Sequence, residues 1–274
     1  MEEKSPKKKK KRGNPLLLFI FLVSLTVCGY FLVQEIQKEL SIREMEADIQ
    51  TYIKVPEPDT ENEEAPEAET VNSFDWDGLL SESPYVIGWI QIPGSERVNY
   101  PIVQHPEDNQ YFLTRDWKGD AQAAGAIFLN RHNSSDFTDM NSVIYGHRMK
   151  SGSMFGTLKY YEDQAYLDEH PYVYIFTPEG RQLTYEIICC AHVSDGSDAY
   201  LMSFRTPEER MAYYNMMLSK AITRRDMELG PFDTTILLST CGAAGSDYYA
   251  RVVVLAKLIG IDVTGYPEGT ETEV

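Results

Sequence analysis

The chain has 274 residues, enough for one substantial domain with appended segments, and its hydrophobic fraction of 43% suits a packed globular core. Its formal net charge is −17 at pH 7, and because residues 1–33 carry +5, the remainder carries −22. An acidic body argues against nucleic-acid binding, which depends on basic surfaces that neutralise phosphates.

The N-terminal residues have the pattern of a membrane anchor. A basic run over residues 7–12 precedes a stretch of 19 residues without a charge, 15–33. As a helix, this stretch would span roughly 28 Å at about 1.5 Å per residue, close to the thickness of the hydrocarbon core. The basic flank favours a cytoplasmic tail over residues 1–14, a single transmembrane helix over 15–33 and an extracellular body. A cleaved signal peptide is the alternative, but no convincing small-x-small cleavage site follows the apolar run.

Residues 34–72 are predicted to form an extracellular linker. Its first part, 34–54, continues with helix-forming charged residues, whereas 56–70 contain seven acidic residues, three prolines and no large apolar side chain. A segment of that composition buries too little surface to fold, and its like charges repel one another. We interpret it as an extended tether.

The folded domain is predicted over residues 73–261, followed by an acidic tail over 262–274. Short apolar runs recur between turn signals, which is typical of strands. Eight strands are predicted, over residues 86–92, 100–104, 125–129, 142–146, 172–177, 182–193, 235–239 and 251–259. Closing them into a barrel would remove exposed strand edges, so the predicted fold class is mainly β with helical insertions, an eight-stranded β-barrel.

Three helices are predicted within this domain, over residues 75–82, 154–161 and 207–221. The last is the longest, lies between the sixth and seventh strands, and begins with a proline at a tolerated first-turn position. Met211, Tyr214, Met217 and Leu218 fall at helical spacing in it, and we interpret that stripe as core packing.

The four cysteines argue against a zinc or redox centre, because no CxxC pair exists. Cys189 and Cys190 are adjacent in a strand-like run and are interpreted as small structural residues, with a vicinal disulfide as the alternative. No acidic cluster has the spacing of a calcium loop. No metal or organic cofactor is predicted.

Three residues at strand ends could carry chemistry. His147 follows the apolar strand that ends in Tyr145-Gly146, Cys241 ends the run Leu237-Leu238-Ser239-Thr240, and Arg251 opens a strand of valines. Strand ends are where a rigid scaffold presents reactive groups to solvent. Together these side chains provide a nucleophile, a proton-transfer group and a fixed cation, which acyl transfer through a thioester requires.

These segments resemble the sortase family. The Tyr-Gly-His segment, the Leu-Ser-Thr-Cys segment and an arginine ten positions after the cysteine carry the resemblance. The strings Asn-Tyr-Pro-Ile-Val-Gln over 99–104 and Asp-Asn-Gln-Tyr-Phe-Leu over 108–113 are similar to class B, as are N-terminal helices and a long helix between strands six and seven. The similarity spans roughly residues 73–261.

The resemblance implies roles for eight residues. Cys241 would be the nucleophile, His147 the general acid/base, and Arg251 the group that stabilises the oxyanion and positions the substrate. The implied sorting-signal groove is lined by Asn109, Leu113, Ser239, Tyr200 and Leu201. Some class B members carry an acidic residue directly after the cysteine, whereas this chain has Gly242.

The implied reaction is a two-step transpeptidation at the outer face of a Gram-positive cell membrane. The substrates would be secreted proteins with C-terminal sorting signals, cleaved after threonine and transferred to an amine of the peptidoglycan cross-bridge. A pilin-polymerising enzyme with a lysine acceptor and a hydrolytic cysteine peptidase are the alternatives, and a catalytically silent surface-binding module is a third.

Overall fold

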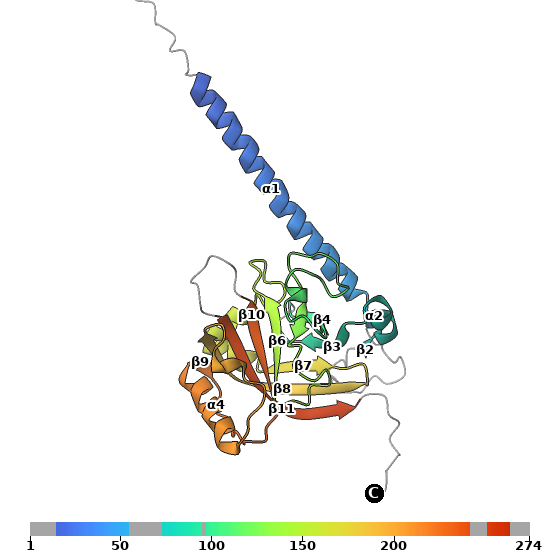
Figure 1. Ribbon diagram of the computed structural model, residues 1–274, viewed down its shortest axis with the longest axis vertical. Helices are drawn as coiled ribbons and strands as arrows, with labels where there is room; N and C mark the ends of the chain where they lie inside the picture. Colours follow the sequence, from blue (N-terminus) through green and yellow to red (C-terminus); the bar gives the residue numbers. More distant parts are fainter. Residues whose placement is uncertain (1–14, 55–72, 95–96, 242–250, 264–274) are drawn as a thin grey trace, which may run out of the picture. The chain divides into compact units, whose positions relative to one another are not determined.

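The computed structural model describes residues 15–54, 73–94, 97–241 and 251–263 (Figure 1). Two compact units are present, Met1–Met45 and Glu46–Val274. The predicted basic tail over residues 1–14, the acidic part of the linker and most of the predicted C-terminal tail lie outside the described residues.

The N-terminal helix α1 (Pro15–Gln50) begins in the first unit and ends in the second. It contains an apolar window of mean hydropathy 1.9 with no part of it buried, so it is long and apolar enough to cross a membrane. The helix continues well beyond residue 33, as the helix-forming residues after that point predict. It stops before Ile53 and Lys54, which form strand β1 (Ile53–Lys54) paired with β2 (Ser73–Phe74) instead of more helix.

Eight strands of the second unit close into a barrel, which confirms the predicted fold. Neighbouring strands pair in the order β11, β10, β6, β5, β4, β3, β7, β8, and β8 pairs back with β11. The strands are β3 (Val86–Gln91), β4 (Asn99–Val103), β5 (Ile127–Leu129), β6 (Asn141–His147), β7 (Tyr172–Phe176), β8 (Arg181–Val193), β10 (Thr235–Cys241) and β11 (Arg251–Val263). The β4–β5 and β6–β10 pairs are parallel and the other pairs of the barrel are antiparallel.

A ninth strand, β9 (Ala221–Arg224), extends the sheet beyond β8 and was not predicted. The predicted helix over 207–221 is α4 (Pro207–Ser219), which ends two residues earlier because Ala221 pairs with Ala191 of β8. Four residues directly after a helix give no separate strand signal.

The remaining helices are short. The predicted helix over 75–82 is α2 (Trp76–Glu82), with Asp75 at its N-cap position. The prediction over 154–161 is wrong in its first half, since Met154 has a φ of 54°, which a right-handed helix excludes, and a 3₁₀ helix begins only at Leu158. The other short helices are η1 (Tyr111–Leu113), η2 (Leu158–Glu162), α3 (Gln164–Glu169) and η3 (Asp198–Tyr200).

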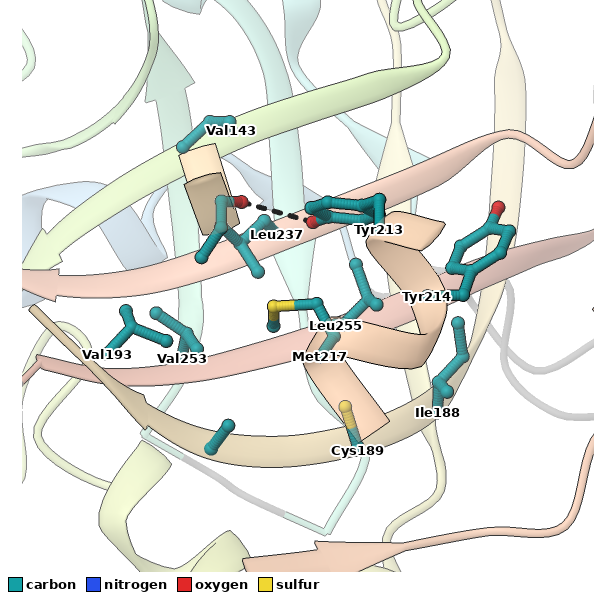
Figure 2. Close-up of a cluster of buried hydrophobic side chains, with 12 residues drawn as sticks. Val143, Ile188, Cys189, Val193, Tyr213, Tyr214, Met217, Leu237, Val253 and Leu255 are labelled. Carbon is teal, nitrogen blue, oxygen red and sulfur yellow. Dashed lines mark hydrogen bonds between the residues drawn. The ribbon is translucent and has the colours of Figure 1, made fainter. Parts of the chain in front are cut away.

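Helix α4 packs against β8, β10 and β11. Figure 2 shows Tyr213 and Met217 of α4 pointing toward Leu237 of β10 and Leu255 of β11, all buried in one cluster. Thr206 caps the helix by accepting the amide of Glu209, and the proline in the first turn confirms the predicted start. The predicted stripe of apolar residues on this helix is therefore core packing.

Arg210 of α4 is fully buried and ties the helix to two strands of the barrel. Its Nη2 donates to the carbonyls of Met140 (2.6 Å) and Asp233 (2.9 Å) and to Thr235 Oγ1 (2.8 Å), next to the starts of β6 and β10. These bonds hold α4 against β6 and β10. The opposite ends of these two strands carry His147 and Cys241.

Candidate active site

Strands β6 and β10 run parallel and in register to the same end of the barrel (Figure 1). Their last paired positions are Cys241 and His147, so the main chains of these two residues lie side by side. The side chain of Cys241 lies outside the described part of the structure. Arg251 opens β11, which pairs antiparallel with β10. Three adjacent strands therefore bring the three predicted residues to one edge.

Residues at alternate positions of β6 and β10 face different layers. Val143 and Leu237, a registered pair, belong to the cluster under α4, whereas Ile144 and Leu238 follow them on the opposite face and are fully buried. Because both faces are covered, these strands are continuous apolar runs in the sequence.

Tyr145 and Ser239 continue the α4 face toward the strand ends, and η3 meets them there. The hydroxyls of Tyr200 and Ser239 lie 3.0 Å apart, and the ring of Tyr200 stacks on Tyr145 at 6.1 Å between centroids. Burial raises the pKa of Tyr200 to about 12, although the hydrogen bond to Ser239 opposes that rise. The phenol therefore keeps its proton at neutral pH.

His147 is half-buried, and its ring is held by the main chain. Its Nε2 lies 2.8 Å from the carbonyl oxygen of Leu113, the last residue of η1. Gly146 before it allows this strand end to pack closely, since a Cβ at that position would lie 2.5 Å from Ile127 Cδ1 and 2.8 Å from the ring of Phe155. The Tyr-Gly-His segment thus has a packing reason for its glycine.

The guanidinium of Arg251 is held from two sides. Its Nη2 donates to Asp195 Oδ2 at 2.8 Å and its Nη1 to the carbonyl of Thr240 at 3.3 Å. The second bond places the cation beside the residue that precedes Cys241. A fixed guanidinium in that position can stabilise negative charge that develops on a substrate oxygen.

Comparison with known proteins decides the family. A sortase-domain model matches residues 90–259. Sortase B of Listeria monocytogenes is 32% identical over 176 residues, which cover 64% of this chain and 70% of that protein. This chain belongs to the sortase family.

Solved structures agree with the class of this sortase. Sortase B from B. anthracis in complex with AAEK1 has a TM-score of 0.65 at 27% identity, covering 82% of this chain and 99% of that one. A Streptococcus pyogenes class B sortase involved in pilus biogenesis has a TM-score of 0.60 at 27% identity, covering 67% and 97%. The chain is a class B sortase, and hence a cysteine transpeptidase.

The structure places the predicted groove residues of the sortase in surroundings that differ from one residue to the next. Leu113 contacts His147 through its carbonyl, and Tyr200 contacts Ser239. The Oδ1 of Asn109 instead accepts the main-chain amide of Arg131 at 3.0 Å. Leu201 lines a cavity of about 700 Å³ between η3 and α4, together with residues of that helix.

Sequence reasoning missed two residues of this region of the sortase. Tyr145 was part of the quoted Tyr-Gly-His segment but received no role, although the period of two along a strand puts it on the face of His147. Asp195 lies in a Ser-Asp-Gly turn, where an aspartate is typical of the turn itself, so only the structure links it to Arg251.

Two other cysteines of the sortase, in β8, are in settings that disfavour reaction. Cys189 and Cys190 are free thiols with no exposed surface, which confirms the structural interpretation over a vicinal disulfide. Burial raises the pKa of each thiol to about 12, so the nucleophilic thiolate is disfavoured. Cys28 lies in the apolar helix α1. Within the described residues, no group of three His, Cys, Asp or Glu side chains could hold a metal ion.

Proposed function

We propose that this sortase cleaves a C-terminal sorting motif after threonine with Cys241 as nucleophile, and transfers the new carboxyl end to an amine of the cell wall. The observation that carries the proposal is the parallel register of β6 and β10, which ends with Cys241 beside His147, next to the strand that Arg251 opens. The inert environments of Cys189 and Cys190 support the choice of cysteine.

The reaction divides into two acyl transfers. The Cys241 thiolate attacks the threonine carbonyl carbon, a C–S bond forms, and a tetrahedral oxyanion develops beside the Arg251 guanidinium. The C–N bond then breaks, and the departing amine takes a proton from His147. In the second step an acceptor amine attacks the thioester, gives a proton to His147 and expels the thiolate, which restores the enzyme.

Substrate contacts are proposed for Leu113, Ser239 and Tyr200, whose positions around His147 and Cys241 support a groove at this edge of the barrel. Asn109 and Leu201 are proposed for the outer parts of the same groove. Tyr145 joins this set because it stacks on Tyr200.

The proposed location is the outer face of the cell membrane, with α1 as an uncleaved anchor and the basic tail in the cytoplasm. The apolar window of α1 and the basic run before it support this topology. Proteins that carry sorting signals cross the same membrane, so an anchored enzyme meets them as they emerge.

A pilin lysine is a second acceptor to consider, because one structural relative at 27% identity is involved in pilus biogenesis. The two acceptors require the same thioester and differ only in the resolving amine. Hydrolysis by water is the third fate of the thioester.

The experiment is incubation of the full-length protein in detergent with a panel of sorting-motif peptides, each with triglycine, a lysine-containing pilin peptide or no acceptor. Mass spectrometry of the products identifies the motif and the acceptor. Product yield that rises with an amine supports transfer, whereas release at an equal rate without any amine supports the hydrolytic peptidase and contradicts the proposal.

A further inference from the structure

The contact between His147 and Leu113 has a defined direction. A carbonyl oxygen only accepts hydrogen bonds, so at 2.8 Å the Nε2 of His147 must carry the hydrogen that it donates. In a neutral imidazole, the lone pair is then on Nδ1.

The fold leaves the Leu113 carbonyl available for this bond. Leu113 is the last residue of η1, and carbonyls in the last turn of a helix lack partners within it. The preceding carbonyl, that of Phe112, accepts the amide of Ala126 at 3.0 Å. The polypeptide from η1 to Ala126 is therefore pinned next to the imidazole, with one main-chain oxygen directed at it.

Gly125 makes the space in which the ring and the carbonyl meet. Its φ of 62° is in the left-handed region, and a Cβ there would lie 3.0 Å from both His147 Cδ2 and the Leu113 oxygen, and 2.5 Å from the Phe112 oxygen. A side chain at this position would push apart the two partners of the hydrogen bond.

We infer that the Leu113 carbonyl and Gly125 form a seat that fixes His147 as the Nε2–H tautomer, so that Nδ1 is the nitrogen that exchanges protons with the cysteine and the amines. Leu113 and Gly125 are positioning residues in this account, and the inference rests on the proposed role of His147. When Nδ1 takes up a proton, the ring becomes cationic, and its bond from Nε2–H to Leu113 strengthens without any atom having to move.

The direct test is NMR of the full-length protein in detergent with ¹⁵N-labelled histidine, at a pH at which the ring is neutral. The signal of His147 is assigned by its loss in His147→Gln. A pyrrole-type Nε2 with a pyridine-type Nδ1 is expected. The opposite pattern, or an even mixture of the two tautomers, would overturn the inference.

A matched pair of glycine variants tests the seat. Gly125→Ala should lower kcat on the order of 10–100-fold, the penalty for a displaced catalytic group, and should weaken the tautomer preference. Gly119→Ala is the control, because its φ of 96° imposes similar backbone strain while its nearest neighbour is the movable hydroxyl of Tyr111 at 3.2 Å. Its kcat and tautomer pattern should match those of the wild type. Equal losses of kcat in both variants would contradict the inference that Gly125 positions His147. An unchanged tautomer pattern in a folded Gly125→Ala protein would contradict it as well.

The two proposals fail separately. The tautomer is read from the wild-type resting protein, and it decides the inference even if Gly125→Ala does not fold. The proposed function depends instead on thioester formation at Cys241, which the histidine signals do not report.

Discussion

Main-chain carbonyls hold two of the side chains assigned to chemistry. Leu113 accepts from His147, and Thr240 accepts from Arg251, so each polar head is oriented by a rigid element. Asp195 adds a carboxylate that contacts Arg251 at 2.8 Å. Gly242 occupies the position after the cysteine where some class B members have an acid, and Asp195 reaches Arg251 from a different loop.

Asp195→Asn should slow the reaction with little effect on stability. The pair with Arg251 is exposed on the aspartate side, at 72%, so its loss should change the free energy of unfolding by less than about 1 kcal/mol. A guanidinium that is no longer fixed should stabilise the oxyanion less, and we expect kcat about 5–30-fold lower. Steady-state kinetics with Asp226→Asn as control checks this. An unchanged kcat in the Asp195 variant would exclude a positioning role.

Cys189 and Cys190 should resist thiol reagents in the native protein. Their pKa values are raised from 9.0 to about 12 by burial, so the folded state holds both protons more tightly than the unfolded state. The stabilisation of the folded state that comes from these two protonated thiols is therefore complete below about pH 9. It declines as the pH rises toward 12. Labelling followed by peptide mapping should find Cys241 modified at neutral pH, and these two only after unfolding. Native labelling of either one at a rate similar to Cys241 would contradict the burial.

At the residue scale, the positions of the candidate site residues were predictable in part. His147, Cys241 and Arg251 each stand at the boundary between an apolar run and a polar segment, which is a local signal. The hydrogen bond between Leu113 and His147 joins residues 34 positions apart, and nothing in either segment encodes it.

At the scale of elements, the eight strands of the barrel were predictable because each is an apolar run bounded by turn residues. β9 was not, because Ala221–Arg224 follow a helix directly and Ile222 on it is exposed. The parallel pairing of β6 with β10 is the decisive feature of the site, and only the closed barrel brings together strands that lie about 90 residues apart.

Gly146→Ala should lower both the stability of the protein and its kcat, because the substitution disturbs the end of β6. The added methyl meets Ile127 and Phe155, and overpacking of this kind costs about 1–3 kcal/mol. The shift should also move His147, so kcat should fall on the order of tenfold at temperatures where the protein stays folded. Thermal unfolding and kinetics measure both effects.

Gly260→Ala is the matched control for that variant, because it also changes a strand glycine, in β11, with no atom within 4 Å of the new methyl. Its melting temperature and kcat should stay near those of the wild type. If Gly146→Ala behaves like Gly260→Ala, the close packing at this strand end does not constrain His147.

At the scale of the whole molecule, the basic N-terminal run and the apolar helix support the proposal of a membrane-anchored enzyme with an extracellular body. The composition and the length of α1 were readable from the sequence, since helical length and hydropathy are local properties. The direction of insertion is a prediction that rests on the lysines before the helix.

Protease added to intact cells tests that direction. The body beyond α1 should be degraded, and an epitope tag before Lys4 should be protected until the membrane is opened. The full-length protein should also stay in the membrane fraction after alkaline extraction. Protection of the body together with loss of the N-terminal tag would reverse the topology, and release by alkaline extraction would exclude a spanning anchor.

The central claim is that Cys241 forms the acyl-enzyme, and the intact mass of the full-length protein with a sorting-motif peptide tests it most directly. Wild type and Cys189→Ala should both gain the mass of the acyl fragment, mapped to Cys241 and discharged by an amine acceptor, whereas folded Cys241→Ala should gain none. An adduct that persists in Cys241→Ala, or that maps to another cysteine, would contradict the account.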